Sequence, residues 1–254
     1  MNPYVILGPI GMMLVGIFSI TFWKFKEGIR ARYFLIGGLV WVISILPKVI
    51  MDLTVTPKLN SWARLTFDTL GFLTIISLYV GLRTGLLECG FTYLAFSRSK
   101  LKESTPKETI AFGIGFGAFE AILISLLAIV QIAVFLLNPS IIELLPKEQR
   151  KLIEAQLNMP TWIVLAPVIE RIFTIIGHIF ATLMIFLYVR LRRIYYILIP
   201  IMYKSIVDAM VPFLQWFYKP TTSLMGMYEA EVWIVVCGLA ALIGTYLTLS
   251  KLKD

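Results

Sequence analysis

Residues 110–137 read IAFGIGFGAFEAILISLLAIVQIAVFLL, and Glu120 is the single ionisable side chain in this stretch. A helix rises about 1.5 Å per residue, so a run of this length is long enough to cross the roughly 30 Å hydrocarbon core of a bilayer. The run is therefore predicted to be a membrane-spanning helix, and its neighbours along the chain share its character.

Six further apolar runs are visible in the sequence. The chain of 254 residues is 59% hydrophobic and only 15% charged, whereas soluble domains carry about 25% charged residues. We predict an all-α, polytopic membrane helix bundle of about seven transmembrane helices, in a single domain at 1–254 with core helices within about 66–217. The runs other than 110–137 are 3–23, 33–51, 66–97, 161–190, 193–217 and 230–250. Those at 3–23, 33–51 and 230–250 are predicted to flank the core.

The positions of Lys and Arg predict how the chain lies in the membrane. The segments 24–32, 98–109 and 190–193 and the C-terminal tail hold 13 of these residues, against 6 on the other side. Cytoplasmic loops are enriched in Lys and Arg, so we predict a multi-pass protein of the cell membrane with the N-terminus out and the C-terminus in. Because the net charge of +8 is gathered in short segments, the expected partner is the lipid bilayer and not nucleic acid. Within the outer segment, 146–157 is either a short interfacial helix or a solvated connector.

Several ionisable side chains lie inside the predicted spans, where each costs several kcal/mol unless it is paired or hydrated. Counted from the predicted cytoplasmic ends, Glu88, Glu120, His178 and Lys204 all lie roughly 13–18 Å deep. A shared depth on four helices predicts one internal polar site. The alternative is an ion-pair network that only holds the helices together. The complete set is Arg83, Glu88, Glu120, Glu170, Arg171, His178, Lys204 and Asp208.

The segments around these residues resemble the YhfC family of intramembrane proteases. Gly85-Leu-Leu-Glu88-Cys89-Gly-Phe-Thr92-Tyr-Leu94 resembles the Glu-Glu-x-x-Arg-Tyr segment of that family. Gly113-Ile-Gly-Phe116-Gly-Ala-Phe-Glu120-Ala-Ile122 resembles its Gly-x-Gly-His-Gly-x-x-Glu-Ala-Ile. Glu170-Arg171 with His178 resembles its Glu-Arg…His helix, and Lys204-Ser-Ile-Val-Asp208 its His-x-x-x-Asp. The resemblance covers about residues 66–215.

The resemblance implies a fold shared with the CAAX prenyl protease and bacteriocin-processing family and, more distantly, with the APH subunit of gamma-secretase. It also implies roles for particular residues. The catalytic candidates are Glu88, Glu120, His178 and Asp208, and the binding candidates are Glu170, Arg171 and Lys204. Four positions depart from the family pattern: Cys89 stands for a glutamate, Thr92 for an arginine, and Phe116 and Lys204 for histidines.

These departures bear on whether the site holds a metal. A catalytic zinc takes about three protein ligands, but His178 is the single histidine of the chain. A charged lysine has three donors and no lone pair, so Lys204 would repel a cation instead of binding it. We therefore expect no metal or other cofactor, and zinc only if the chain is an active protease. The hypothesis is that Lys204 replaces the lost positive charge among Glu88, Glu120 and Asp208.

Three functions remain open on the sequence alone. The first is a catalytically degenerate relative of the proteases that binds a transmembrane segment of a partner or forms a complex with it. The second is an active intramembrane protease, with Glu120 or Glu88 as general base on a water and His178 orienting it or stabilising the oxyanion. The third is an ion- or proton-coupled transporter subunit, because intramembrane carboxylates beside a lysine can relay protons.

Overall fold

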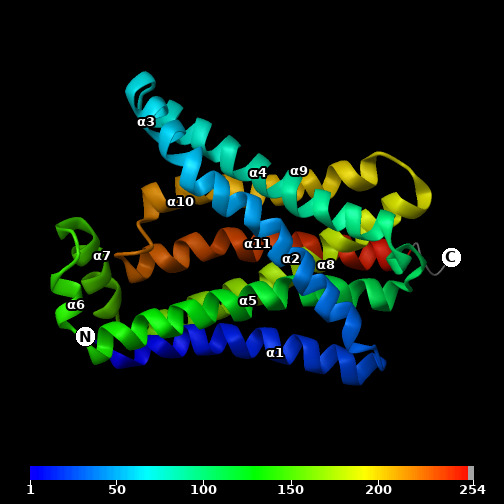
Figure 1. Cartoon of the computed structure of the whole chain (residues 1–254), viewed down its shortest axis with the longest axis horizontal. Coiled ribbons are helices and arrows are strands. Elements are labelled where there is room, and N and C mark those ends of the chain that lie inside the picture. Colours follow the sequence, from blue (N-terminus) through cyan, green and yellow to red (C-terminus); the bar gives the residue numbers. More distant parts are fainter. Residues whose placement is uncertain (251–254) are drawn as a thin grey trace.

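The computed structural model describes residues 1–250, and these residues form helices joined by short connections. Seven of the helical segments in this part of the chain are long and apolar enough to cross a membrane, which confirms the all-α fold and the number of spans. The chain begins at one end of the bundle and α11 ends at the other, as an odd number of spans requires (Figure 1). The orientation stays a prediction, and Lys251 and Lys253, which were counted for it, lie outside the described residues.

Most of the spans are single α-helices that contain most of each expected apolar run and extend beyond several of them by a few residues. The first is preceded by a turn of 3-10 helix at Pro3–Ile6, and the fifth by one at Thr161–Val164. The sixth is divided between two helices. The spanning helices are α1 (Leu7–Glu27), α2 (Ala31–Thr54), α4 (Thr69–Arg98), α5 (Pro106–Leu137), α8 (Leu165–Leu191), α9 (Tyr195–Ala209), α10 (Val211–Tyr218) and α11 (Leu224–Ser250).

Three short helices lie between spans at the end of the bundle where the chain begins. The segment between the apolar runs 33–51 and 66–97, for which no helix was predicted, contains α3 (Thr56–Thr66). This helix projects from the bundle beside the start of α4 (Figure 1). The outer segment folds into α6 (Ser140–Glu143) and α7 (Lys147–Leu157). The 146–157 stretch is thus a helix and not an irregular connector.

The start of α5 follows from its sequence. Thr105 and Glu108 form a capping box: the Thr105 Oγ1 accepts from the Glu108 N–H at 3.3 Å, and the Glu108 carboxylate accepts from the Thr105 N–H at 2.8 Å. Pro106 occupies the first turn, where its missing N–H is not needed. The helix therefore begins immediately after the basic segment. Glu120 lies fourteen residues after Pro106, about 21 Å along the helix axis.

Glycines let α5 touch two helices at once. A Cβ on Gly115 would lie 2.1 Å from the Phe34 carbonyl oxygen of α2, and one on Gly113 would lie 2.8 Å from the Ile179 Cα of α8. These approaches are possible only because neither residue has a side chain. As a result α5 is fixed between α2 and α8, the two helices that carry Lys48 and His178.

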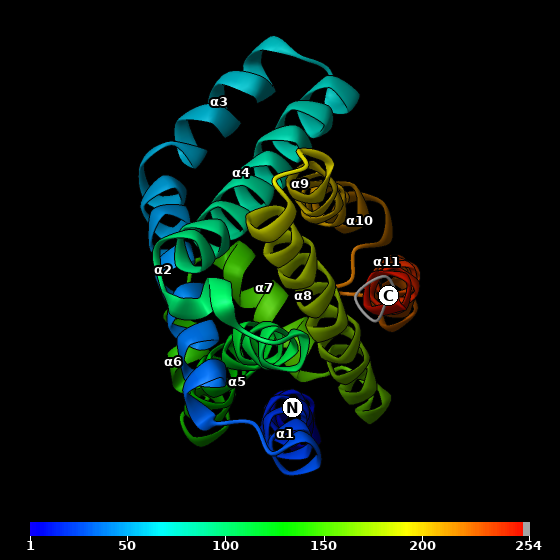
Figure 2. The same cartoon turned by 90° about the vertical axis from the view of Figure 1, so that its right-hand side faces the viewer.

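The bundle is organised around α8, which is the most buried of the spans. It packs against α5, α9 and α11, with α4 and α1 also in contact. Figure 2, viewed from the end, shows α8 between α5 on one side and α9 and α11 on the other. The helix α2 crosses the bundle diagonally from α5 to α3, so it also reaches α4 (Figure 1).

The sixth span is interrupted at Met210, between α9 and α10. Pro212 lies in the first turn of α10 and lacks the N–H that would bond the carbonyl of Asp208. The break therefore lies next to one of the polar residues identified from the sequence.

Candidate functional site

Glu88 of α4 is buried between two lysines. Lys204 of α9 lies 2.8 Å from one carboxylate oxygen, and Lys48 of α2 lies 2.5 Å from the other. The three residues are 5–8% exposed. Two ammonium groups on a single carboxylate leave this group of three with a net positive charge, which a further carboxylate must balance if the charges are to remain buried.

Glu120 of α5 anchors a second group of charges on α8. The Arg171 guanidinium donates to Glu120 at 2.8 Å and also to its neighbour Glu170. The second Glu120 oxygen lies 2.9 Å from His178 Nε2. Both Glu120 oxygens are therefore engaged by α8.

His178 and Lys204 join the two groups. The Lys204 ammonium lies 3.4 Å from each ring nitrogen of His178, and His178 is 3% exposed. An ammonium can only donate, so Nε2 donating to Glu120 leaves Nδ1 as the nitrogen that can accept from Lys204. This arrangement gives a continuous chain of contacts from Glu88 through Lys204 and His178 to Glu120.

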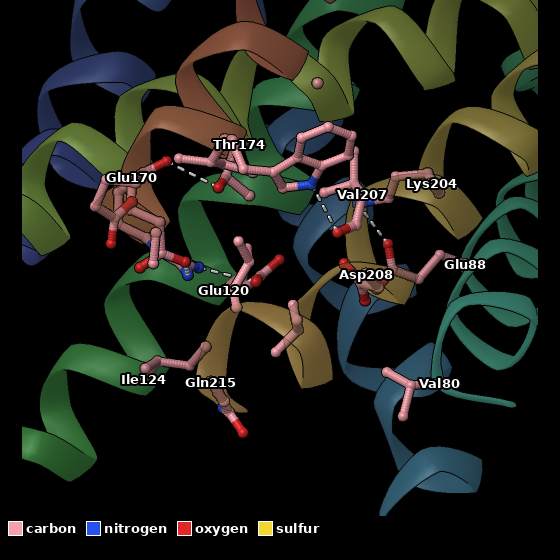
Figure 3. Close-up of a pocket in the computed structure, with 18 of the residues that line it drawn as sticks. Val80, Glu88, Glu120, Ile124, Glu170, Thr174, Lys204, Val207, Asp208 and Gln215 are labelled. Carbon is pink, nitrogen blue, oxygen red and sulfur yellow. Dashed lines mark hydrogen bonds and ion pairs between the residues drawn. The ribbon is translucent and has the colours of Figure 1, made fainter. Parts of the chain in front are cut away.

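These groups line a cavity of about 430 Å³ at the centre of the bundle. Figure 3 shows Glu120 and Glu170 on one side of the cavity, with Glu88, Lys204 and Asp208 on the other. Asp208 is one helical turn from Lys204 on α9 and lines the same cavity. Glu231 of α11 also lines the cavity. Within residues 1–250, neither Asp208 nor Glu231 has an ion-pair partner within 4.0 Å.

The cavity opens sideways between α5 and α10. Ile124 of α5 and Val211 of α10 are on its lining and are 39% and 38% exposed. Gln215, one turn after Val211, is also exposed and lines the same space. Because both helices are membrane spans, the mouth faces the lipid at the flank of the bundle and not the water at its ends.

A second cavity, of about 350 Å³, adjoins the first. Its walls come from α1, α5, α7 and the turn before α8, and they are mainly apolar. The two cavities share Glu170, Pro220, Met227 and Glu231 as lining residues. The two acidic side chains thus lie where the central cavity continues toward the end of the bundle that carries α7.

The structure brings together seven of the eight ionisable residues singled out from the sequence. Arg83 is the exception, because it pairs with Asp52 of α2 away from the cavity. The seven at or beside the cavity are Glu88, Glu120, Glu170, Arg171, His178, Lys204 and Asp208.

Two residues of this cluster were missed by the sequence analysis. Lys48 is a charged residue inside the apolar run at 33–51, which marks it as a candidate, but a flanking helix was not expected to reach the site. Glu231 was placed at the edge of a run starting at 230, yet α11 begins at Leu224. Seven residues of helix precede Glu231, which sets it about 10 Å inside the span.

The donor set does not fit a catalytic zinc ion. Zinc takes about three N, S or O ligands and keeps one position open, but Lys204 Nζ lies within 3.4 Å of both His178 nitrogens and 2.8 Å from Glu88. A lysine ammonium has no lone pair to offer a metal. Across residues 1–250, no three His, Cys, Asp or Glu side chains are grouped so that they could hold an ion.

Seven spans around a buried cluster of carboxylates, lysines, an arginine and a histidine define a multi-pass membrane protein with an internal polar site. Comparison with protein families matches residues 11–234 to the YhfC intramembrane metalloprotease family. The chain belongs to this family, as its motifs predicted. No curated protein and no solved structure matches it.

The four positions that depart from the family motifs lie around one small space. Cys89, Thr92, Phe116 and Lys204 line a cavity of about 10 Å³ together with Glu88 and His178. This volume is at the lower limit for holding a single water molecule. The Phe116 ring packs on His178 with centroids 4.7 Å apart. Three uncharged side chains and the Lys204 ammonium therefore fill the surroundings of Glu88 and His178.

Proposed function

We propose that this chain is a catalytically inactive member of the YhfC family that binds a transmembrane segment of another membrane protein in its central cavity. The observation that carries the proposal is the Lys204 ammonium between Glu88 and His178, at 2.8 and 3.4 Å. It takes the place that a metal ion or an activated water would need beside these two residues. Lys48 adds a second positive charge to the same carboxylate.

The state of Glu120 also argues against catalysis. A general base takes a proton from water on a lone pair, and one Glu120 oxygen already accepts from Arg171 while the other is bound to His178. Each of these contacts uses a lone pair and leaves fewer of them for a water molecule.

The cavity suits a helical or extended peptide segment that approaches through the lipid. Its walls include apolar side chains from α2, α10 and α11, and its mouth lies between Ile124 and Val211. Desolvated backbone polar groups of such a segment need partners inside a membrane. The polar side chains of the cavity supply them.

A second candidate is an active protease that works without a metal. It is favoured by the 2.9 Å contact between His178 Nε2 and Glu120 Oε2, which is the geometry of an acid–base pair. The transporter hypothesis has less support: the sixth span is interrupted at Met210, but many transporter sites are built from a pair of broken helices.

Cross-linking and cleavage of the same peptide distinguish these candidates. The probe is a leucine-rich transmembrane peptide of about 20 residues, with one cysteine, reconstituted in liposomes with the protein. We expect it to form a disulfide with an Ile124→Cys variant at the mouth and not with a Leu14→Cys variant, because Leu14 is an exposed residue of α1 outside both cavities.

Mass spectrometry of the peptide should then find it intact. Cleavage that disappears in a Glu120→Gln variant would establish the protease instead. Equal cross-linking at both cysteine positions would show that the mouth is not a binding site and would refute the proposed function.

A further inference from the structure

The charges that line the central cavity are not balanced. Five carboxylates face it, against three cationic side chains, so with every group ionised its walls carry a net charge of about −2. The carboxylates are those of Glu88, Glu120, Glu170, Asp208 and Glu231, and the cations are Lys48, Arg171 and Lys204. Uncompensated charge in a membrane interior is costly, so it is neutralised either by protonation of a carboxyl group or by a cation that enters the cavity.

The excess lies on one side of the cavity. On the α2, α4 and α9 side, Lys48 and Lys204 are matched by Glu88 and Asp208. On the α5, α8 and α11 side, Arg171 is the single cation against Glu120, Glu170 and Glu231. Glu231 has no ion-pair partner among the residues that the structure describes. The missing positive charge therefore belongs beside Glu170 and Glu231.

This position can be reached from the cavity. Glu170 keeps a third of its side chain exposed, and both it and Glu231 line the two adjoining cavities. Lys48 and Lys204 are held by Glu88 on the other side and do not pair with either residue. A basic side chain on an occupant of the cavity would therefore compensate the carboxylates of Glu170 and Glu231.

We propose that the occupant of the central cavity is a transmembrane peptide segment with a lysine or arginine, whose basic side chain pairs with Glu170 and Glu231. This inference rests on the proposed function, because it specifies the segment that the cavity binds. The depth follows from the helices: Glu231 is seven residues into α11, so the basic residue belongs about 10 Å from that membrane face.

The test compares three peptides that differ at one position. Each is a fluorescently labelled, leucine-rich span of about 20 residues, with Lys, Leu or Glu about seven residues from the end on the α7 side. Binding is measured by fluorescence anisotropy with the full chain in lipid nanodiscs. We expect the Lys peptide to bind at least about tenfold more tightly than the Leu peptide, and the Glu peptide to bind most weakly.

Variants of the chain locate the interaction. Glu231→Gln should reduce the preference for the Lys peptide over the Leu peptide to less than about threefold. Glu229→Gln is the matched control, because Glu229 is on the same helix and lines neither cavity. Equal thermal stability of the two variants excludes an effect through folding.

The outcomes separate this inference from the proposed function. Equal binding of the Lys and Leu peptides to the unmodified chain refutes the inference that the occupant carries a basic side chain, and it does not contradict peptide binding itself. A preference that survives in Glu231→Gln places the charge elsewhere and also refutes it. Binding of none of the three peptides refutes the proposed function, and the inference that rests on it.

Discussion

Replacing Lys204 by methionine tests whether this lysine serves as the internal counter-ion of the site. The substitution keeps much of the length of the side chain and removes its charge. Removal of one partner from a buried ion pair costs about 3–5 kcal/mol. Glu88 keeps Lys48 at 2.5 Å, so the lower end of this range applies and the loss should be about 3 kcal/mol.

The expected change in melting temperature follows from this free energy. For a chain of this size, 1 kcal/mol shifts Tm by about 2–4 °C, so Lys204→Met should lower Tm by about 6–12 °C. Tryptophan fluorescence during thermal unfolding in detergent measures it. Lys102→Met is the control and should leave Tm unchanged, because Lys102 is exposed and no ion pair involves it within residues 1–250.

A double variant separates charge from packing. Without Lys204, the group of Lys48, Glu88 and Asp208 has one negative charge too many. Asp208→Asn removes that charge, so the double variant Lys204→Met/Asp208→Asn should regain at least half of the lost Tm. A Tm of Lys204→Met within about 2 °C of the unmodified chain would refute the counter-ion role. Failure of Asp208→Asn to rescue it would show that the lysine acts through packing.

Other features of the site give further predictions. Lys48→Met should destabilise the fold by about 3 kcal/mol and lower Tm in the same assay by about 6–12 °C, because it removes the second cation from Glu88. An unchanged Tm would show that Lys48 of α2 does not stabilise the site. Incubation with EDTA and 1,10-phenanthroline should leave Tm unaltered, and a chelator-induced fall reversed by zinc would contradict the conclusion about the donor set. Gly115→Leu should prevent folding or lower the yield of monodisperse protein on size-exclusion chromatography, because its Cβ would lie 2.1 Å from the Phe34 carbonyl oxygen; the matched control Gly90→Leu, where a Cβ meets nothing within 4 Å, should not.

The loss of catalysis that we propose is compatible with retention of the fold on physical grounds. The helices are held by close backbone contacts and by pairs between charged groups, and neither depends on turnover. Cys89, Thr92, Phe116 and Lys204 fill or neutralise the space beside Glu88 and His178. On the proposed function, such a site keeps its shape and its mouth to the lipid without a position for a metal or an activated water.

The sequence by itself determined the membrane-spanning architecture. A bilayer requires long apolar helices whose backbone groups are satisfied within each helix, so the seven spans are visible as local runs of residues. Depth along each helix is also local, since it is a count of residues multiplied by a fixed rise. For that reason Glu88, Glu120, His178 and Lys204 were expected at one level, and the structure brings them to one cluster.

Only the tertiary structure decided which charges meet. Pairing across helices depends on how each helix is rotated, tilted and crossed, and these are set by packing contacts between segments far apart in the chain. The diagonal path of α2 brings Lys48 to Glu88, and the early start of α11 carries Glu231 into the cavity. Neither position can be counted from an apolar run, and both change the charge of the site, on which the proposed partner depends.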